Sequence, residues 1–365
     1  MRRIRILALT SYPVEAAATR YRIEQYRPLL REFGIDVDLS PFLSPETFRI
    51  LYVRGQTVRK SLGLVAAMLR RVPLLWRARR ADGIFLQREA ALFGPPLVEW
   101  VLARLWHKPL ILDLDDATFV SYVSPTYGSL VTPLKWFRKT DSLIRWADAV
   151  IAGNRYIAHY VSERGKPVTI LPTVVDTDVF KPKEESSDVP IVGWIGSHST
   201  FPFIKAILPV LEEVGRTHRF RLKIVGGSET VRLSTVEVVN EPWRLEREVE
   251  DFRSLDIGLY PILADKWSVG KSGFKAVQYM AVGIPTVASA VGAVTEIIED
   301  GVTGFLVRTP EEWYDRLHRL LEDPKLRRRM GRAARERAVT RFSLTAQAEI
   351  LRDVIADVVD RKRMA

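Results

Sequence analysis

The chain alternates short apolar runs with amphipathic stretches, and it does so in two successive series. The first series opens with the apolar run Ile4 to Leu9. The second opens at Ile191, after a polar stretch from Lys181 to Pro190 that holds two prolines and two serines. Alternation of this kind predicts parallel sheets covered by helices, and the polar stretch between the series predicts a linker. We therefore expect an α/β chain of two Rossmann-like domains facing across a cleft, with a boundary near 183–188.

Composition narrows the class of protein. The 365 residues are enough for two domains, and a hydrophobic fraction of 47% supports full cores. The absence of cysteine excludes disulfides, a thiolate nucleophile and cysteine-bound zinc. The start of the chain lacks the pattern of a signal peptide, and no apolar run is long enough to span a membrane. We expect a cytoplasmic protein, and its net charge of +11 indicates anionic partners.

The stretch from Trp267 to Gly292 reads as a loop with glycines, a short helix, a turn and a buried strand. At helical spacing, Lys271, Lys275 and Gln278 share one face, and the apolar residues share another. A lysine at the start of a helix opposes the helix dipole unless an anion binds there, and glycines such as Gly273 let backbone N–H groups approach a phosphate. These residues predict an anion site, and the alternative is a solvated lysine face.

A second loop with small residues begins the second series. It follows the run Ile191 to Ile195, precedes a helix expected over Pro202 to Val214, and contains Gly196, Ser197, His198 and Ser199. Backbone N–H groups and hydroxyls at the start of a helix predict a phosphate cradle. For His198 the alternative is a hydrogen bond within the loop.

Polar residues follow several expected strands of the first series. Arg20 and Tyr21 open a helix, Arg88 and Asn154 end strands, and Asp113, Asp115 and Asp116 lie at the end of another strand. Sites of doubly wound sheets lie at such strand ends. The carboxylates are consistent with a metal-binding Asp-x-Asp, with a general base, or with a structural pair to Arg88.

Residues 49–80 carry nine basic side chains and no acidic one, with apolar residues and a tryptophan between them. A basic amphipathic stretch of this kind indicates contact with an anionic membrane surface. The alternatives are a helix that faces the core with a basic solvent side, and a nucleic-acid groove. Because no nucleic-acid motif and no stacking pattern of aromatics is present, we expect no nucleic-acid partner.

One ordered motif contains Lys271, Lys275, Gln278, Gly283 and Pro285, and it is followed by Glu296 and the Gly301-Val-Thr-Gly304 turn. This motif resembles the donor-site region of retaining glycosyltransferases of the GT-B fold, family 4. The resemblance implies an acceptor-side domain over 1–183, a nucleotide-sugar-binding domain over 184–343, and a helix over 344–365 that packs on the first domain.

The resemblance also implies the reaction and the roles of residues. A hexosyltransferase of this family moves a sugar from a nucleotide-sugar to a hydroxyl of a glycan or lipid-linked acceptor, with retained configuration and without a metal or further cofactor. Lys271 and Lys275 would stabilise the leaving diphosphate, and Asp115 and Asp116 would bind the acceptor hydroxyl or act as base. The remaining implied residues are Gly196, Ser197, His198, Ser199, Gly273, Gln278 and Glu296 at the donor, and Arg20, Tyr21, Arg88 and Asn154 on the acceptor side.

The sequence departs from the family pattern at three positions. Trp194 stands where the pattern has an arginine, and its two glutamates fall on Gly270 and Gln278. Two alternatives therefore stay open. One is a catalytically weakened protein that binds nucleotide or glycan as a partner. The other is a different GT-B enzyme, such as a nucleotide-sugar epimerase.

Overall fold

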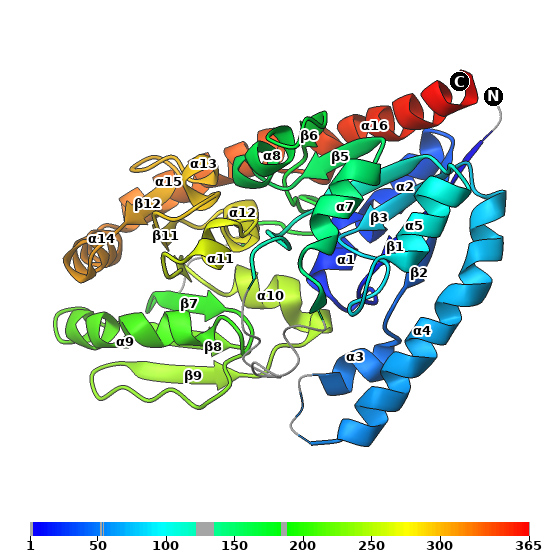
Figure 1. The fold of residues 1–365 in the computed structure, drawn as a ribbon. Helices are drawn as coiled ribbons and strands as arrows, with labels where there is room; N and C mark the ends of the chain where they lie inside the picture. Colours follow the sequence, from blue (N-terminus) through cyan, green and yellow to red (C-terminus); the bar gives the residue numbers. More distant parts are fainter. Residues whose placement is uncertain (1–2, 52, 54, 122–134, 184–187, 365) are drawn as a thin grey trace. The chain divides into compact units, whose positions relative to one another are not determined.

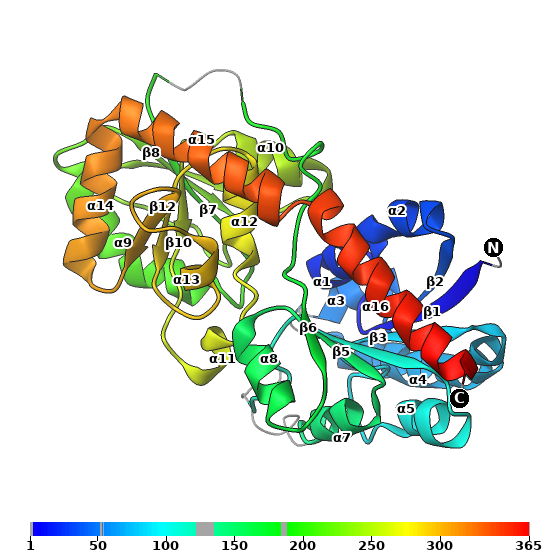
Figure 2. The same cartoon turned by 90° about the horizontal axis from the view of Figure 1, so that it is seen from above.

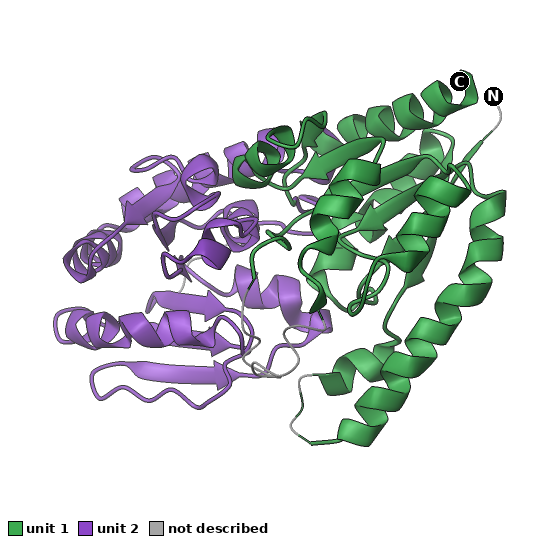
Figure 3. Ribbon diagram, viewed as in Figure 1, with its two compact units in different colours: residues 1–173, 347–365 green, residues 174–346 purple. Residues whose placement is uncertain are grey.

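The structure is a computed structural model that describes residues 3–51, 53, 55–121, 135–183 and 188–364. The chain divides into two compact units, one made of residues 1–173 and 347–365 and the other of residues 174–346 (Figure 3). The change from the first unit to the second falls between Thr173 and Val174, earlier in the chain than the boundary expected at 183/184.

The first unit is built on a six-stranded parallel sheet (Figure 1). Its spatial order is β2 (Ile35–Pro41), β1 (Ile4–Thr10), β3 (Gly83–Gln87), β4 (Leu110–Leu114), β5 (Ala149–Ala152) and β6 (Val168–Ile170). These runs form central strands because nearly every side chain in β1, β3 and β4 is buried, as in a sheet covered on both faces. The strand order reverses at β1, whose neighbours are β2 and β3.

Helices connect these strands. They are α1 (Ala17–Arg22), η1 (Glu24–Tyr26), α2 (Arg27–Glu32), α3 (Pro45–Leu51), α4 (Thr57–Arg80), α5 (Leu97–Trp100), η2 (Val101–Leu105), α7 (Lys139–Trp146) and α8 (Arg155–Ser162).

No helix in the described ranges is both long enough and apolar enough to cross a membrane.

The last helix, α16 (Leu344–Met364), is the red helix that ends at the C-terminus in Figure 2. It starts in the second unit and belongs to the first from Gln347 onward. Its Arg363 pairs with Asp82 at 3.0 Å and its Lys362 with Asp148 at 3.5 Å. Asp82 and Asp148 directly precede β3 and β5, so the end of α16 lies at the amino ends of these strands.

The second unit repeats the architecture with another six-stranded parallel sheet. Its order is β12 (Gly304–Val307), β11 (Thr286–Ser289), β10 (Ile257–Tyr260), β7 (Ile191–Ile195), β8 (Arg221–Val225) and β9 (Glu237–Glu241). Here the order reverses at β7, which lies between β10 and β8. The helical segments are α9 (Phe201–Gly215), η4 (Leu245–Arg247), α10 (Glu248–Arg253), α11 (Lys266–Val269), α12 (Phe274–Ala281), α13 (Val294–Ile297), α14 (Pro310–Glu322) and α15 (Pro324–Arg341).

Trp194 belongs to the core of the second unit. It lies on β7, is 2% exposed, and packs edge-on against Phe201 of α9 with ring centroids 6.0 Å apart. The tryptophan at this family position is therefore an apolar packing residue.

Candidate functional site

The donor residues expected from the sequence come from three separate segments of the second unit. The first segment, Gly196 to Ser199, follows β7; the second, Lys271 to Gln278, follows β10; and Glu296 follows β11. All three therefore lie at the carboxyl edge of the sheet, meaning the row of carboxyl ends of its strands. The strand order reverses at β7, which lies between β10 and β8, and doubly wound sheets bind ligands at such a point of the carboxyl edge.

Tyr279 fixes α12 at this edge of the sheet. Its side chain is fully buried, and its hydroxyl accepts from the backbone N–H of Ile195 at 3.2 Å and donates to the carbonyl of Leu259 at 3.3 Å. A side chain at Gly258 would meet the Tyr279 ring at 2.6 Å, so glycine permits the close approach. Burial raises the pKa of Tyr279, which keeps the hydroxyl protonated and able to donate. One side chain thus joins α12 to the ends of β7 and β10.

The helix begins later than the sequence suggested. Gly273, at a φ of +67°, precedes its first residue, Phe274, and Lys271 lies in the loop between α11 and α12. The prediction of one helical face carrying Lys271, Lys275 and Gln278 was wrong for Lys271, because the left-handed backbone at Gly273 interrupts the helix. The Lys271 ammonium lies 3.4 Å from the centroid of the Trp267 ring.

Close backbone approaches hold this loop against the segment that carries Glu296. A side chain at Gly273 would meet Ile297 at 2.5 Å, and one at Gly292 would collide with the carbonyl of Val269. The backbone carbonyl of Glu296 accepts from Arg337 at 3.0 Å. Packing therefore brings the second and third donor segments together within this unit.

Gln278 differs most from its predicted setting. It is fully buried, whereas the sequence placed it on a polar face with Lys271 and Lys275. Its Oε1 accepts from Lys275 Nζ at 3.2 Å, and its Nε2 has no hydrogen-bond partner among the described residues. Reversing the amide would place Nε2 beside the Lys275 ammonium, donor against donor, so the lysine fixes the orientation of the amide. A buried donor without a partner is rare, and a bound ligand is one group that could satisfy it.

The loop after β7 is short and internally bonded. The Ser197 N–H donates to Thr200 Oγ1 at 3.1 Å, and the Ser197 and Ser199 hydroxyls lie 2.9 Å apart. Gly196 is required here because any side chain would collide with the Trp194 ring. Partial burial lowers the pKa of His198, which favours a neutral imidazole near pH 7.

At the carboxyl edge of the first sheet, Arg88 binds two of the expected carboxylates. It contacts both oxygens of Asp115 at 2.5 and 2.6 Å and one oxygen of Asp116 at 2.6 Å. Burial opposes ionisation of Asp115, but Arg88 outweighs it and holds the pKa of that carboxyl below its usual value. Arg88 has a φ of +62°, a strained conformation for a non-glycine residue. The structural pair that the sequence left open is therefore present.

A second buried ion pair at this edge was missed. Arg22, 1% exposed, binds both oxygens of Asp113 and donates to the carbonyl of Leu171 at 2.6 Å. The partners are 91 positions apart, and the sequence carries no local signal that connects them. Asp113 and Asp115 thus each hold a different arginine.

The other acceptor-side residues have local roles in the structure. Arg20 donates to the carbonyls of Val14 and Glu15 at 3.2 and 3.0 Å and lies 4.8 Å from the ring centroid of the buried Tyr21. Asn154 caps α8 by accepting from the Ile157 N–H at 2.9 Å. Their acceptor roles stay predictions.

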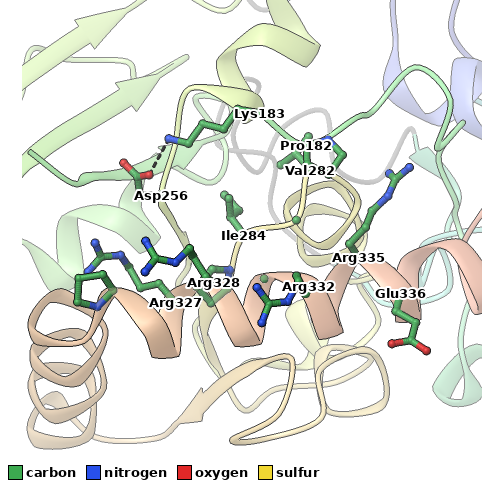
Figure 4. A pocket seen from close by; sticks show the side chains of 14 residues that line it. Pro182, Lys183, Asp256, Val282, Ile284, Arg327, Arg328, Arg332, Arg335 and Glu336 are labelled. Carbon is green, nitrogen blue, oxygen red and sulfur yellow. Dashed lines mark ion pairs between the residues drawn. The ribbon is translucent and has the colours of Figure 1, made fainter. Parts of the chain in front are cut away.

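A cavity of about 430 Å³ also lies in the second unit, lined by Pro182, Lys183, Asp256, the turn 282–285 and side chains of α15 (Figure 4). Arg335, one of these side chains, donates to the carbonyls of Thr177, Phe180 and Ala281. The donor residues expected from the sequence do not line this cavity.

Within the described ranges, no cluster of three or more His, Cys, Asp or Glu side chains could hold a metal ion.

Comparisons with known proteins define the class. Residues 189–323 match the family model of glycosyl transferases group 1. A D-inositol 3-phosphate glycosyltransferase of Nocardiopsis dassonvillei is 26% identical over 275 residues, which cover 66% of this chain and 63% of that relative. The match thus spans less than two thirds of the relative's length.

Solved structures extend the likeness to nearly the whole chain. HepE of Anabaena, solved with UDP, superposes with a TM-score of 0.66 at 17% identity, covering 97% of this chain and 100% of that one. Sucrose-phosphate synthase of Thermosynechococcus elongatus superposes with a TM-score of 0.70 at 17% identity, covering 99% and 100%. The fold is GT-B, as expected from the sequence. Within the second unit, residues 189–323 are similar to the group 1 glycosyltransferases.

Proposed function

We propose that the protein is a retaining glycosyltransferase that moves a sugar from a nucleotide-sugar to a hydroxyl of a glycan or lipid-linked acceptor, without a metal. The match of residues 189–323 to the model of glycosyl transferases group 1 supports the reaction class, and the likeness to HepE, solved with UDP and with UDP-glucose, supports a nucleotide-sugar donor. We further propose that it acts in the cytoplasm, at the inner face of the membrane.

One observation carries the donor site. Three segments distant in sequence lie at the carboxyl edge of the second sheet, and there the buried Gln278 Nε2 has no partner among the described residues. In the proposed complex this N–H donates to a hydroxyl or carbonyl oxygen of the donor. The unsatisfied donor then gains a hydrogen bond that is absent without ligand.

The chemistry requires stabilisation of the leaving diphosphate and of an oxocarbenium-like sugar. In the proposed site the Lys271 and Lys275 ammonium groups neutralise the diphosphate, and backbone N–H groups of the loop after Gly196 add hydrogen bonds. On the acceptor side, Asp115 and Asp116, held by Arg88, would accept the hydroxyl proton or orient the hydroxyl.

The second candidate function is a nucleotide-binding partner protein with weak or no turnover. Three observations favour it: Trp194 is a core residue, and Gly270 and Gln278 stand at the positions of the family's two glutamates. Such a protein would bind nucleotide and leave the donor intact. A nucleotide-sugar epimerase would instead convert the donor without any acceptor.

The test is a panel of nucleotide-sugars assayed for slow hydrolysis, epimerisation and thermal stabilisation. The Lys271→Ala, Lys275→Ala double variant is the probe, and Lys325→Ala, an exposed lysine at the start of α15, is the matched control. One donor should be hydrolysed, with the rate reduced on the order of 10²-fold in the double variant and unchanged in the control. Stabilisation without turnover, even when glycan and lipid-linked acceptors are supplied, would establish the partner protein instead.

A further inference from the structure

The helix α4 of the first unit is apolar on two opposite sides. Its inner side is buried and holds Ala67, Arg71, Leu74 and Ala78. Its outer side exposes a row that we call the outer stripe: Val58, Leu62, Val65, Leu69, Val72 and Trp76, each between 55% and 72% exposed. The stripe residues recur in alternating steps of four and three, which keeps them on one line along an α-helix, half a turn away from the buried side.

An exposed apolar row of this length is unusual on a water-facing helix. It covers 18 residue steps, or roughly 27 Å of helix. Basic side chains accompany it: Arg59, Arg70 and Arg77 follow one flank, and Arg79 and Arg80 lie at its end. Arg77 also pairs with Asp38 at 2.5 Å. Across residues 57–80 the helix carries seven basic side chains and no acidic one.

Two occupants fit an apolar row with steps of four and three: a second copy of α4 in a coiled coil, or the surface of a lipid bilayer. The charges decide between them. A symmetric coiled coil would place arginine flanks against each other, with no acidic side chain in the helix to pair with them. An anionic bilayer can bind both, because its acyl chains contact the apolar row and its phosphates contact the arginines.

We propose that α4 is a membrane-docking helix that lies in the plane of an anionic bilayer, with the outer stripe inserted among the acyl chains and the arginines at the phosphate level. The sequence predicted membrane contact over 49–80 without naming a face. The structure assigns the contact to the side of α4 opposite its buried side.

The inner side of the same helix leads to the candidate acceptor residues. Arg71 donates to the carbonyls of Ala90 at 2.7 Å, Ser40 at 3.0 Å and Thr10 at 3.2 Å. Thr10 and Ser40 lie at the carboxyl ends of β1 and β2, and Ala90 follows Arg88 in the loop after β3. Arg71 therefore ties α4 to the carboxyl edge of the first sheet, about 10 Å across the helix from the outer stripe.

This connection indicates an acceptor class. A helix docked through its outer stripe would hold the carboxyl edge of the first sheet close to the bilayer, so we infer that the acceptor hydroxyl is carried by a lipid or a lipid-linked glycan. This step rests on the proposed glycosyl transfer, whereas docking itself does not.

The experiment is co-sedimentation of the full chain with vesicles of phosphatidylcholine alone and of phosphatidylcholine mixed with phosphatidylglycerol, at low and high salt. The probe is Leu69→Glu. The control is Val339→Glu, which introduces a glutamate at another exposed apolar position, on α15. We expect binding to the anionic vesicles that weakens with salt, falls about tenfold or more in Leu69→Glu, and is unchanged in Val339→Glu. Because Leu69 is exposed, thermal unfolding should be the same in all three proteins.

Trp76 supplies a second readout. Brominated acyl chains should quench part of the tryptophan fluorescence of the wild-type protein on vesicle binding, and Trp76→Phe should remove that part. Three results would each overturn the proposal. They are absence of vesicle binding, binding of Leu69→Glu equal to that of the wild type, and a wild-type dimer in sedimentation that is lost in Leu69→Glu. Donor hydrolysis by Leu69→Glu without vesicles should match the wild-type rate, so a failed donor site and a failed docking helix give different results.

Discussion

The carboxyl edges of the two sheets are held together in different ways. At the carboxyl edge of the first sheet, arginines and aspartates bind each other. At the carboxyl edge of the second sheet, a tyrosine hydroxyl and closely packed glycines hold the donor segments in place. The first edge depends on the Arg22–Asp113 and Arg88–Asp115 pairs, all of whose side chains are at least four-fifths buried. The second depends on Tyr279, on Gly258 beneath its ring, and on Gly196 beside Trp194. The difference teaches that two sheets of related topology can position polar residues by charge or by shape, and that the two modes should fail differently on mutation.

Arg88→Gln should have the largest effect on stability. It leaves the buried Asp115 carboxylate without its cation, which costs about 3 kcal/mol in comparable cases. Urea unfolding would measure the loss. The control is Arg361→Gln, which breaks the exposed Arg361–Asp357 pair and should cost no more than about 0.5 kcal/mol. Equal losses in the two variants would show that charge does not organise the first edge.

Gly196→Ala tests shape at the second edge. The added methyl group collides with the Trp194 ring, so we expect a loss of about 2 kcal/mol in the free energy of unfolding. A second substitution, Trp194→Leu, removes the obstructing ring. In a double-mutant cycle the loss from Gly196→Ala should shrink when leucine replaces the tryptophan, and strict additivity would contradict the steric explanation.

Gln278→Met separates binding from stability. The change removes a buried donor that has no partner in the described part of the chain and also the Oε1 that accepts from Lys275. The first effect stabilises and the second destabilises, so the free energy of unfolding should move by less than about 1 kcal/mol in either direction. Affinity for UDP should nevertheless fall about tenfold, because a hydrogen bond to the ligand is lost. Calorimetric titration with UDP and urea unfolding would measure the two quantities. A large loss of stability with unchanged affinity would indicate a structural role for the amide.

The smallest expected effect concerns pH. Partial burial, with His318 alongside, lowers the pKa of His218, whose Nε2 lies 2.5 Å from Nδ1 of His318. Because the folded pKa is below the unfolded one, the unfolded chain takes up the proton first, and stability falls as pH drops below the unfolded value of about 6.5. The melting temperature should fall by about a degree between pH 7.5 and pH 5.5, and His318→Gln should reduce this dependence.

The sequence predicted what depends on local pattern. The two series of strands and helices and the placement of polar residues at strand ends follow from runs of a few residues. The fold class was confirmed, because buried parallel strands are local in the chain, and an ordered local motif indicated the family that residues 189–323 match. The membrane contact of residues 49–80 stays a prediction.

What the sequence could not predict depends on contacts between distant segments. Helical spacing put Gln278 on a polar face, but its side chain is fully buried in the structure. The partner of Asp113 is Arg22, 91 positions earlier in the chain, and only the fold brings the two side chains together. The outer stripe of α4 was missed for the same reason, since periodicity shows that a helix has an apolar side without showing which side is covered.

The path of α16 has a consequence for synthesis of the protein. Residues 347–365 complete the first unit, and Leu351, Ile355 and Val359 are buried there. On a ribosome, residues 174–346 must be made between the two parts of that unit, which takes about 10 to 30 s at typical rates. During that time the nascent first unit exposes the apolar surface that α16 later covers. The first unit to be synthesised is thus the last to be completed, and a chaperone that covers this surface would act on the nascent chain and have no binding site on the finished protein.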